Sequence, residues 1–231
     1  MEKLLRGIVD FRTNKLPTLA ERFRHLADDG QKPDVLFFAC SDSRVEPSLI
    51  VSTDPGELFM VRTVGNLVAP ASNDGISVGD VSEASAIEYA VHVLGVKHIV
   101  VCGHSRCGAM KATLAGRDKL TQAPNLAAWL AHAEPAKERL ARSPFISNAL
   151  PPEDRLSQAN VLVQLDNVAS FGGVHGLAHG GQISLHAWWF DVATGDLHVL
   201  DEERGGYILL DEAEAERVLE GRATVHHTHG G

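Results

Sequence analysis

Two short apolar runs constrain the fold more than any other feature of this sequence. They are DVLFFAC at residues 34–40 and KHIVVCG at 97–103, and each is typical of a strand buried on both faces, as in a parallel sheet. The stretch VSEASAIEYAVHVL at 81–94 lies between them, has a helical pattern and is followed by Gly95. A strand, a helix and a second strand in this order predict a right-handed parallel crossover. The chain is therefore expected to be an α/β protein.

The other segments fit the same domain. Helices are expected at 16–28 and 152–170 and, punctuated by prolines, from about 107 to 143. The segment GQISLHAWWFDVATGDLHVLDEE at 181–203 predicts an antiparallel hairpin around ATGD. We therefore expect a mixed sheet with a parallel core, flanking helices and a C-terminal hairpin. Residues 1–231 are interpreted as a single domain, with a helical arm at about 1–30 and a frayed tail at about 222–231.

Composition narrows the possible partners and the compartment. The net charge is −9, from 30 acidic and 21 basic residues, which argues against nucleic acid or an anionic membrane as partner and favours a small-molecule substrate. No run reaches the roughly 18 apolar residues of a membrane span, and MEKLLRGIVDFRTNK lacks the apolar region of a signal peptide. Three cysteines, an odd number, argue for reduced thiols. We expect a cytoplasmic protein.

Three potential metal ligands follow the two apolar runs. Cys40 ends the first run, and His104 and Cys107 come directly after the second. Functional residues of an open parallel sheet gather at the carboxyl ends of its strands, so these side chains are expected to meet if the strands are neighbours. Two thiolates and one imidazole suit tetrahedral Zn²⁺, and three protein ligands with one open position are typical of a catalytic zinc. The sequence thus predicts a catalytic zinc site.

Other interpretations of the same residues stay open. A nucleophilic cysteine with a histidine base would use one thiol and leave the other without a role. A structural or regulatory zinc protein without turnover would need a permanent fourth ligand, for which Asp42 is the evident candidate. A redox switch could use Cys102 and Cys107, although Cys102 is interpreted as an apolar residue of the buried strand.

Asp42 and Arg44 follow Cys40 closely and suggest a gate at the metal. The Asp42 carboxylate is near enough to become a fourth ligand, which would displace water and close the site. Arg44 offers it a competing, bidentate partner, which would hold Asp42 off the metal and orient it toward a zinc-bound hydroxide. The plainer alternative is a structural salt bridge.

Four segments give the sequence a recognisable family pattern. They are FACSDSRVEPS, DPGELFMVRTVGN, AIEYAV and VCGHSRCGAM. With them the chain resembles the β-class carbonic anhydrases over most of its length. The resemblance implies zinc-dependent, reversible hydration of carbon dioxide to bicarbonate and a proton, in a homodimer or a dimer of dimers. A related hydrolase, such as a carbon disulfide hydrolase, would keep the same zinc and is an alternative.

The resemblance also implies a substrate pocket. In plant-like members, a glutamine, a phenylalanine and a tyrosine that match Gln31, Phe59 and Tyr89 line the active site across the dimer interface. The equivalent of Val64 forms an apolar wall, and Gly108 is assigned to the same pocket.

A second group in the family has an inhibitory bicarbonate site made of a tryptophan, an arginine and a tyrosine. The corresponding positions here are Phe37, Arg62 and Phe190, so only the arginine matches. The resemblance therefore favours the plant-like group, without that secondary site.

The anionic ligand set predicts a pH dependence of activity. A zinc held by three neutral histidines lowers the pKa of its water to about 7. Because two thiolates cancel the formal charge of the ion, the water should be less acidic here, and the hydration rate should rise with pH into the alkaline range. Stopped-flow rates across pH would measure this. A profile that is flat from acid to neutral pH would contradict it.

Overall fold

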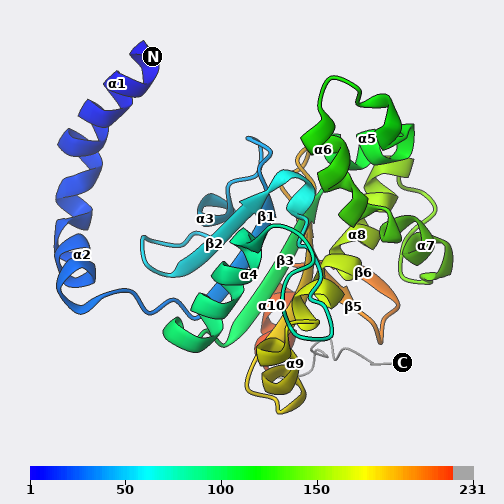
Figure 1. The fold of residues 1–231 in the computed structure, drawn as a ribbon. Helices are drawn as coiled ribbons and strands as arrows, with labels where there is room; N and C mark the ends of the chain where they lie inside the picture. The colour runs from blue at the N-terminus through cyan, green and yellow to red at the C-terminus, as the bar shows by residue number, and fades with distance from the viewer. Residues whose placement is uncertain (221–231) are drawn as a thin grey trace.

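The protein is built around one mixed sheet. A computed structural model describes residues 1–220, and its strands are β1 (Val35–Cys40), β2 (Leu58–Thr63), β3 (His98–His104), β4 (Ser184–Phe190), β5 (Leu197–Asp201) and β6 (Gly206–Leu209). The order across the sheet is β2-β1-β3-β4-β5-β6 (Figure 1). The first four strands are parallel, and β5 and β6 continue antiparallel. The predicted mixed sheet with a parallel core is confirmed.

Helices flank this sheet. The α-helices are α1 (Glu2–Asp10), α2 (Leu16–Asp29), α3 (Pro47–Ile50), α4 (Val81–Glu88), α5 (Gly108–Ala115), α6 (Pro124–Trp129), α7 (Pro135–Arg142), α8 (Pro152–Ala169), α9 (Gly172–His179) and α10 (Glu212–Leu219). Short π-helical segments span Phe11–Lys15 and Tyr89–Leu94, and short 3₁₀ segments span Val64–Asn66, Arg117–Lys119 and Leu130–Ala133. The tail predicted at about 222–231 lies outside the described residues.

All four predicted strands are found, and the two central ones, β1 and β3, are almost wholly buried. β1 and β3 are parallel neighbours, with Val35 beside His98 and Ala39 beside Cys102. The hairpin is confirmed as β4 and β5. Two strands were not predicted: β2, an edge strand with only partly buried side chains, and the four-residue β6. β6 is short, and the apolar run of β2 has only four residues before Arg62, less than the runs that identified the central strands.

The predicted helices are also present, with two differences. The segment 81–94 is α4 followed by a π-helical turn, and it ends at Gly95, whose φ of 68° is left-handed and therefore suits glycine. The stretch from about 107 to 143 is three separate helices, α5, α6 and α7, of which the last two begin at Pro124 and Pro135.

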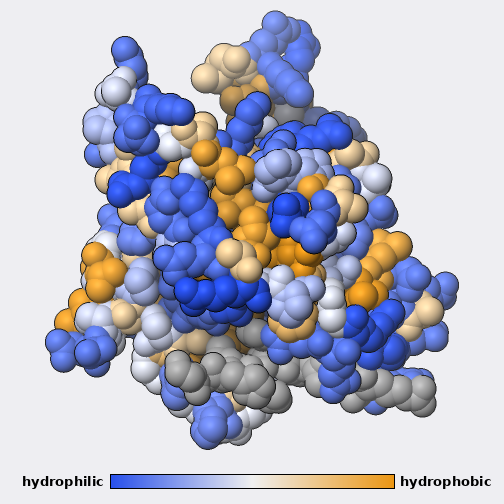
Figure 2. All heavy atoms as spheres, turned by 90° about the vertical axis from the view of Figure 1, so that its right-hand side faces the viewer, coloured by the Kyte–Doolittle hydropathy of each residue, from blue (hydrophilic) through white to orange (hydrophobic). Residues whose placement is uncertain are grey.

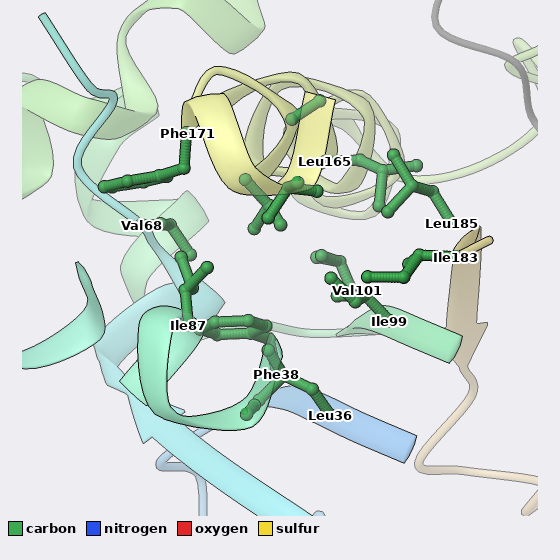
Figure 3. Close-up of a cluster of buried hydrophobic side chains, with 14 of the residues drawn as sticks. Leu36, Phe38, Val68, Ile87, Ile99, Val101, Leu165, Phe171, Ile183 and Leu185 are labelled. Atoms are coloured by element: carbon green, nitrogen blue, oxygen red, sulfur yellow. The ribbon is translucent and has the colours of Figure 1, made fainter. Parts of the chain in front are cut away.

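Alternate residues of the central strands point to opposite faces of the sheet. Leu36 and Phe38 of β1 belong to the larger core with Ile99 of β3, whereas Phe37 and Ala39 belong to a separate cluster. The larger core packs against α8 and the helices near it (Figure 3). Most of the 18 residues of α8 are buried, as expected of a helix that is enclosed on nearly all sides.

The N-terminal arm stands apart from this core. From Glu2 to Asp29 the chain is helical with no buried residue, and it projects away from the sheet (Figure 1). The side chains of Leu4, Ile8 and Val9 are 65%, 58% and 64% exposed. Near its end, Arg22 donates hydrogen bonds to the Pro55 carbonyl and to Glu57. The arm therefore presents apolar side chains away from its own chain.

The side of the molecule that carries α5, α6 and α7 has apolar side chains gathered at its centre, with hydrophilic ones around them (Figure 2).

Within residues 1–220, no helix combines the length and the apolar character needed to cross a membrane.

Candidate metal centre and active site

The carboxyl ends of β1 and β3 bring the three predicted ligands together. The ligand atoms of Cys40, His104 and Cys107 all lie within 4.8 Å of one another. The three residues are only 5%, 0% and 1% exposed. Cys40 is the last residue of β1, His104 the last of β3, and Cys107 caps the N-terminus of α5. The two neighbouring parallel strands therefore bring the two motifs to one point.

The His104 ring has a defined tautomer. Its Nδ1 lies 2.8 Å from the Ser105 carbonyl oxygen, which can only accept, so Nδ1 carries the proton. Its Nε2 is buried and has no hydrogen-bond partner. An unprotonated imidazole nitrogen fixed in this way is the form that binds a metal ion.

The two thiols differ in their acidity. The pKa of Cys40 is lowered to about 4, chiefly by a hydrogen bond from Cys107, and also by contacts that include the Gly65 backbone N–H at 3.3 Å. The pKa of Cys107 is raised, because it shares that hydrogen bond and is buried. Two adjacent buried thiolates repel each other, so the pair carries both charges only with a cation between them.

These observations together fit a divalent metal ion. In a tetrahedral zinc site, sulfur ligands about 2.3 Å from the ion lie about 3.8 Å apart, within the spacing of this cluster. The cluster supplies two sulfurs and one nitrogen. It is the only group of three or more His, Cys, Asp and Glu ligands with such spacing among residues 1–220. The donor set and the free Nε2 of His104 therefore both suit a metal ion.

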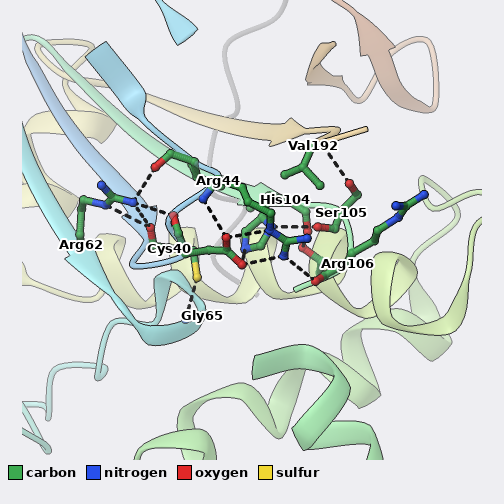
Figure 4. A network of polar contacts seen from close by, with 12 residues as sticks. Cys40, Arg44, Arg62, Gly65, His104, Ser105, Arg106 and Val192 are labelled. Atoms are coloured by element: carbon green, nitrogen blue, oxygen red, sulfur yellow. Dashed lines mark hydrogen bonds and ion pairs between the residues drawn. The ribbon is translucent and has the colours of Figure 1, made fainter. Parts of the chain in front are cut away.

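Asp42 and Arg44 form a bidentate pair beside the cluster (Figure 4). Arg44 Nε donates to Asp42 Oδ1 at 2.9 Å, and Nη2 donates to Oδ2 at 2.7 Å. Arg44 Nη2 also donates to the Arg106 carbonyl at 3.1 Å. Asp42 Oδ2 lies 3.9 Å from His104 Nε2. The hydrogen bonds from Arg44 hold the pKa of Asp42 well below its usual range, so this carboxylate is ionised and accepts hydrogen bonds.

Arg62 fixes the loop that carries Asp42. From β2 its guanidinium donates to the backbone carbonyls of Cys40 at 3.1 Å, Asp42 at 2.8 Å and Val45 at 2.5 Å (Figure 4). It also lies 3.3 Å from the Glu46 carboxylate. One side chain thus satisfies three carbonyls of a loop that has no regular structure. The sequence indicated Arg62 only through the family pattern, and nothing in the spacing predicted this role.

The buried helix α8 supports the site from behind. Ser157 Oγ donates to the His104 carbonyl at 2.8 Å, and Asn160 Nδ2 donates to the Gly65 carbonyl at 3.0 Å. Asp154 accepts a hydrogen bond from the Arg106 backbone N–H. Sequence reasoning missed these three residues. Their only signal was the presence of polar side chains in a helix that the fold encloses.

A glycine allows α8 to approach so closely. A Cβ on Gly103 would lie 2.6 Å from Val161 Cγ2 and 3.1 Å from Ser157 Oγ, so any larger residue before His104 would push α8 away from β3. Gly103, which precedes His104 in the motif GHSRC, is therefore required for the close packing of α8 against β3.

The predicted pocket residues fall into two groups. Val64 and Gly108 lie next to the metal cluster. Val64 precedes Gly65, whose backbone N–H donates to Cys40 Sγ, and Gly108 begins α5 directly after Cys107. Gln31 is exposed before the start of β1, and Phe59 pairs with Leu36 near that same end. Four residues of strand, about 13 Å, separate the Phe59 position from the carboxyl end of the sheet.

Phe59 and Tyr89 nevertheless form a pair of their own. Their ring centroids are 5.7 Å apart, and Tyr89 is 44% exposed. Within a single chain, the structure does not bring Gln31, Phe59 and Tyr89 to the metal cluster.

Comparison with known proteins agrees with this site. The family model for carbonic anhydrase matches residues 35–197. A carbonic anhydrase of Pseudomonas aeruginosa is 39% identical over 96% of this chain and 97% of its own, and one of Helicobacter pylori is 32% identical over 94% and 98%. Among solved structures, the β-carbonic anhydrase CcaA has a TM-score of 0.81 at 32% identity, covering 94% of this chain and 96% of its own.

A second solved structure is that of tetrameric β-carbonic anhydrases from Sordaria macrospora, with a TM-score of 0.71, 28% identity and coverage of 86% and 95%. The chain belongs to the β-class carbonic anhydrases, a family of enzymes.

Proposed function

We propose that this enzyme catalyses the zinc-dependent, reversible hydration of carbon dioxide to bicarbonate and a proton. The observation that carries the proposal is the buried convergence of Cys40, Cys107 and the unpartnered His104 Nε2 beside a bidentate Asp42–Arg44 pair. The names of its relatives in Pseudomonas aeruginosa and Helicobacter pylori support the same reaction.

The two thiolates and His104 Nε2 would hold the ion. When bound, zinc supplies Lewis-acid chemistry, because it lowers the pKa of a coordinated water molecule. The chain leaves that position free by keeping Asp42 on Arg44. A loss of the Arg44 contacts would release the carboxylate toward the cluster, where it would act as a fourth ligand and close the site.

Asp42 has a second role in this proposal. Its Oδ2, 3.9 Å from His104 Nε2, is placed to accept a hydrogen bond from the O–H of the attacking nucleophile. Because Arg44 keeps the pKa of Asp42 low, the carboxylate stays an acceptor and turns the nucleophile's lone pair away from itself. The half-exposed side chain of Val64 would form an apolar wall of the substrate pocket. A hydrogen bond from Trp129 Nε1 to the Val64 carbonyl holds this residue in place.

We also propose that a second chain completes the substrate pocket. Gln31, Phe59 and Tyr89 lie too far from their own metal cluster to reach its substrate. Phe59 belongs to the partly exposed edge strand β2, and Tyr89, whose ring packs against it, begins the π-helical segment after α4 and is 44% exposed. The apolar side chains of the arm are a further unpaired surface. A homodimer, alone or as half of a tetramer, would cover these surfaces and bring the three residues to the partner's site.

The enzyme is proposed to lack a secondary bicarbonate site. Phe37 is 1% exposed in the core, and Phe190 is 9% exposed, so neither offers a polar group. The guanidinium of Arg62 is already bonded to three carbonyls. An anion would have to displace those contacts.

Removal of a ligand tests the metal site. Cys107→Ala should lose the zinc that wild-type protein carries and lower the hydration rate at least about 100-fold. Cys102→Ala is the matched control, because Cys102 is a buried thiol in a different cluster, with its pKa raised to about 12 by burial. Cys102→Ala should keep both the zinc and the hydration rate of the wild type. Elemental analysis and stopped-flow hydration on the same samples measure the two quantities. Zinc retained by Cys107→Ala, or zinc without hydration in wild type, would contradict the proposal.

Removal of Arg44 tests the gate. Arg44→Ala should keep zinc but lower the hydration rate about 10- to 100-fold, because the freed Asp42 becomes a ligand. Arg142→Ala removes an exposed arginine that pairs only with Glu138 on the same helix, and should change neither. The gate is wrong if Arg44→Ala keeps the full rate.

Mixed dimers test the shared pocket. One chain carries Cys107→Ala, and the other carries Phe59→Ala and Tyr89→Ala, so each homodimer should be impaired. In the mixed dimer, one site combines an intact cluster with an intact Phe59–Tyr89 pair, and about half of the wild-type rate should return. The control combines Cys107→Ala with Cys40→Ala, where no site can be complete. No recovery in the first mixture would show that these residues act within their own chain.

A further inference from the structure

The turn between His104 and Cys107 contains a residue with an unfavourable backbone conformation, Arg106. Its φ of 55° lies in the left-handed region, which a residue with a Cβ rarely adopts. Within residues 1–220, the other non-glycine residues with a positive φ are Ser52 and Asn66. A conformation of this kind persists only where the surrounding contacts hold it.

The contacts that hold this turn are made by the backbone of Arg106. Its N–H donates a hydrogen bond to Asp154 Oδ1, and its carbonyl accepts one from Arg44 Nη2 at 3.1 Å. The Arg106 side chain is exposed and takes no part in either bond. The left-handed turn is therefore fixed between Asp154 on one side and Arg44 on the other.

Asp154 is the rigid partner of the two. It is 5% exposed and lies in the first turn of α8, a helix that is almost wholly buried. One helical turn later, Ser157 Oγ donates to the His104 carbonyl at 2.8 Å. The helix thus holds two points of the turn, and Asp154 is the residue that holds Arg106.

One nitrogen of Arg44 connects the turn to the gate (Figure 4). Arg44 Nη2 donates both to the Arg106 carbonyl at 3.1 Å and to Asp42 Oδ2 at 2.7 Å. Because a guanidinium is planar and its N–H directions are fixed, the position of the Arg106 carbonyl constrains how Arg44 faces Asp42.

We propose that Asp154 is a positioning residue for the gate: it holds the left-handed turn at Arg106, whose carbonyl in turn anchors Arg44. The inference rests on the proposed function of the Asp42–Arg44 pair. Without Asp154, Arg106 would relax to a negative φ and its carbonyl would turn away from Arg44. Asp42 would then leave Arg44 for the metal cluster more often, and the site would be closed for a larger fraction of the time.

Azide binding to the Co²⁺-loaded protein measures how often the site is open. Azide is a small anion that takes the coordination position of water, and the visible absorption of Co²⁺ changes when a ligand is exchanged. Closure by Asp42 competes with azide, so the apparent dissociation constant rises as the open fraction falls. This measurement needs no turnover. Hydration by the zinc-loaded protein is measured alongside it.

Removal of the Asp154 carboxylate should partly close the site. Asp154→Ala should raise the apparent dissociation constant of azide about 10-fold, with the metal retained. Asp154→Asn keeps an acceptor oxygen for the Arg106 N–H and should stay within about 3-fold of wild type. Asp166→Ala is the matched control, because Asp166 lies about 18 Å further along the same helix, where it binds Arg139. The control should leave azide binding unchanged.

A double-mutant cycle shows whether Asp154 acts through Arg44. In an Arg44→Ala background the Arg106 carbonyl has no guanidinium to anchor, so Asp154→Ala should add less than about 2-fold. A residue that only stabilised the fold would have the same effect in both backgrounds.

Arg106→Gly tests the left-handed turn itself. Glycine adopts a positive φ about as readily as a negative one, so the turn then depends less on Asp154. In the Arg106→Gly background, the effect of Asp154→Ala should fall from about 10-fold to about 3-fold or less.

Three results would overturn the inference: azide binding unchanged in Asp154→Ala, equal effects with and without Arg44, or loss of the metal, which would mean that Asp154 acts on Cys107. If Asp154→Ala does not fold, Asp154→Ser replaces it, because its hydroxyl is polar but too short to reach the Arg106 N–H. The expected azide results, together with no hydration by zinc-loaded wild type, would overturn the proposed function and support the role of Asp154.

Discussion

The candidate active site depends on one constraint: the parallel pairing of β1 with β3. Because these strands are neighbours and run in the same direction, Cys40 at the end of one and His104 at the end of the other reach the same edge of the sheet. The turn after His104 then returns Cys107 to that point as the cap of α5. An antiparallel arrangement of the same two strands would place the ligands a strand's length apart.

Two sets of hydrogen bonds fix the geometry of this edge of the sheet. Arg62 bonds to the carbonyls of the loop after β1, and α8 bonds to the segments around β3 and Gly65 through Ser157 and Asn160. Both use side-chain donors to satisfy backbone carbonyls that no strand or helix partner reaches. The irregular loops that follow β1 and β3, which carry Asp42 and Cys107, are therefore held on both sides.

The sequence could predict what depends on local pattern. The apolar runs of β1 and β3 and the spacing of His104 and Cys107 are local, and they determine the central strands and the ligand set. The edge strand β2 could not be found in this way, because one side of it is exposed and its residues mix apolar with polar. The hydrogen bond from Arg62 to the Val45 carbonyl joins residues 17 positions apart, and the one from Ser157 to the His104 carbonyl joins residues 53 positions apart. Only the tertiary structure reveals such pairs.

The dependence of the site on α8 has a consequence for how the enzyme loses activity on heating. Asp154, Ser157 and Asn160 each tie a different segment of the site to a helix that is itself embedded in the core. A helix enclosed in this way opens only when the whole domain opens. Heat inactivation that begins within a chain should therefore be as cooperative as the unfolding of that chain, so that only separation of the proposed dimer could precede it.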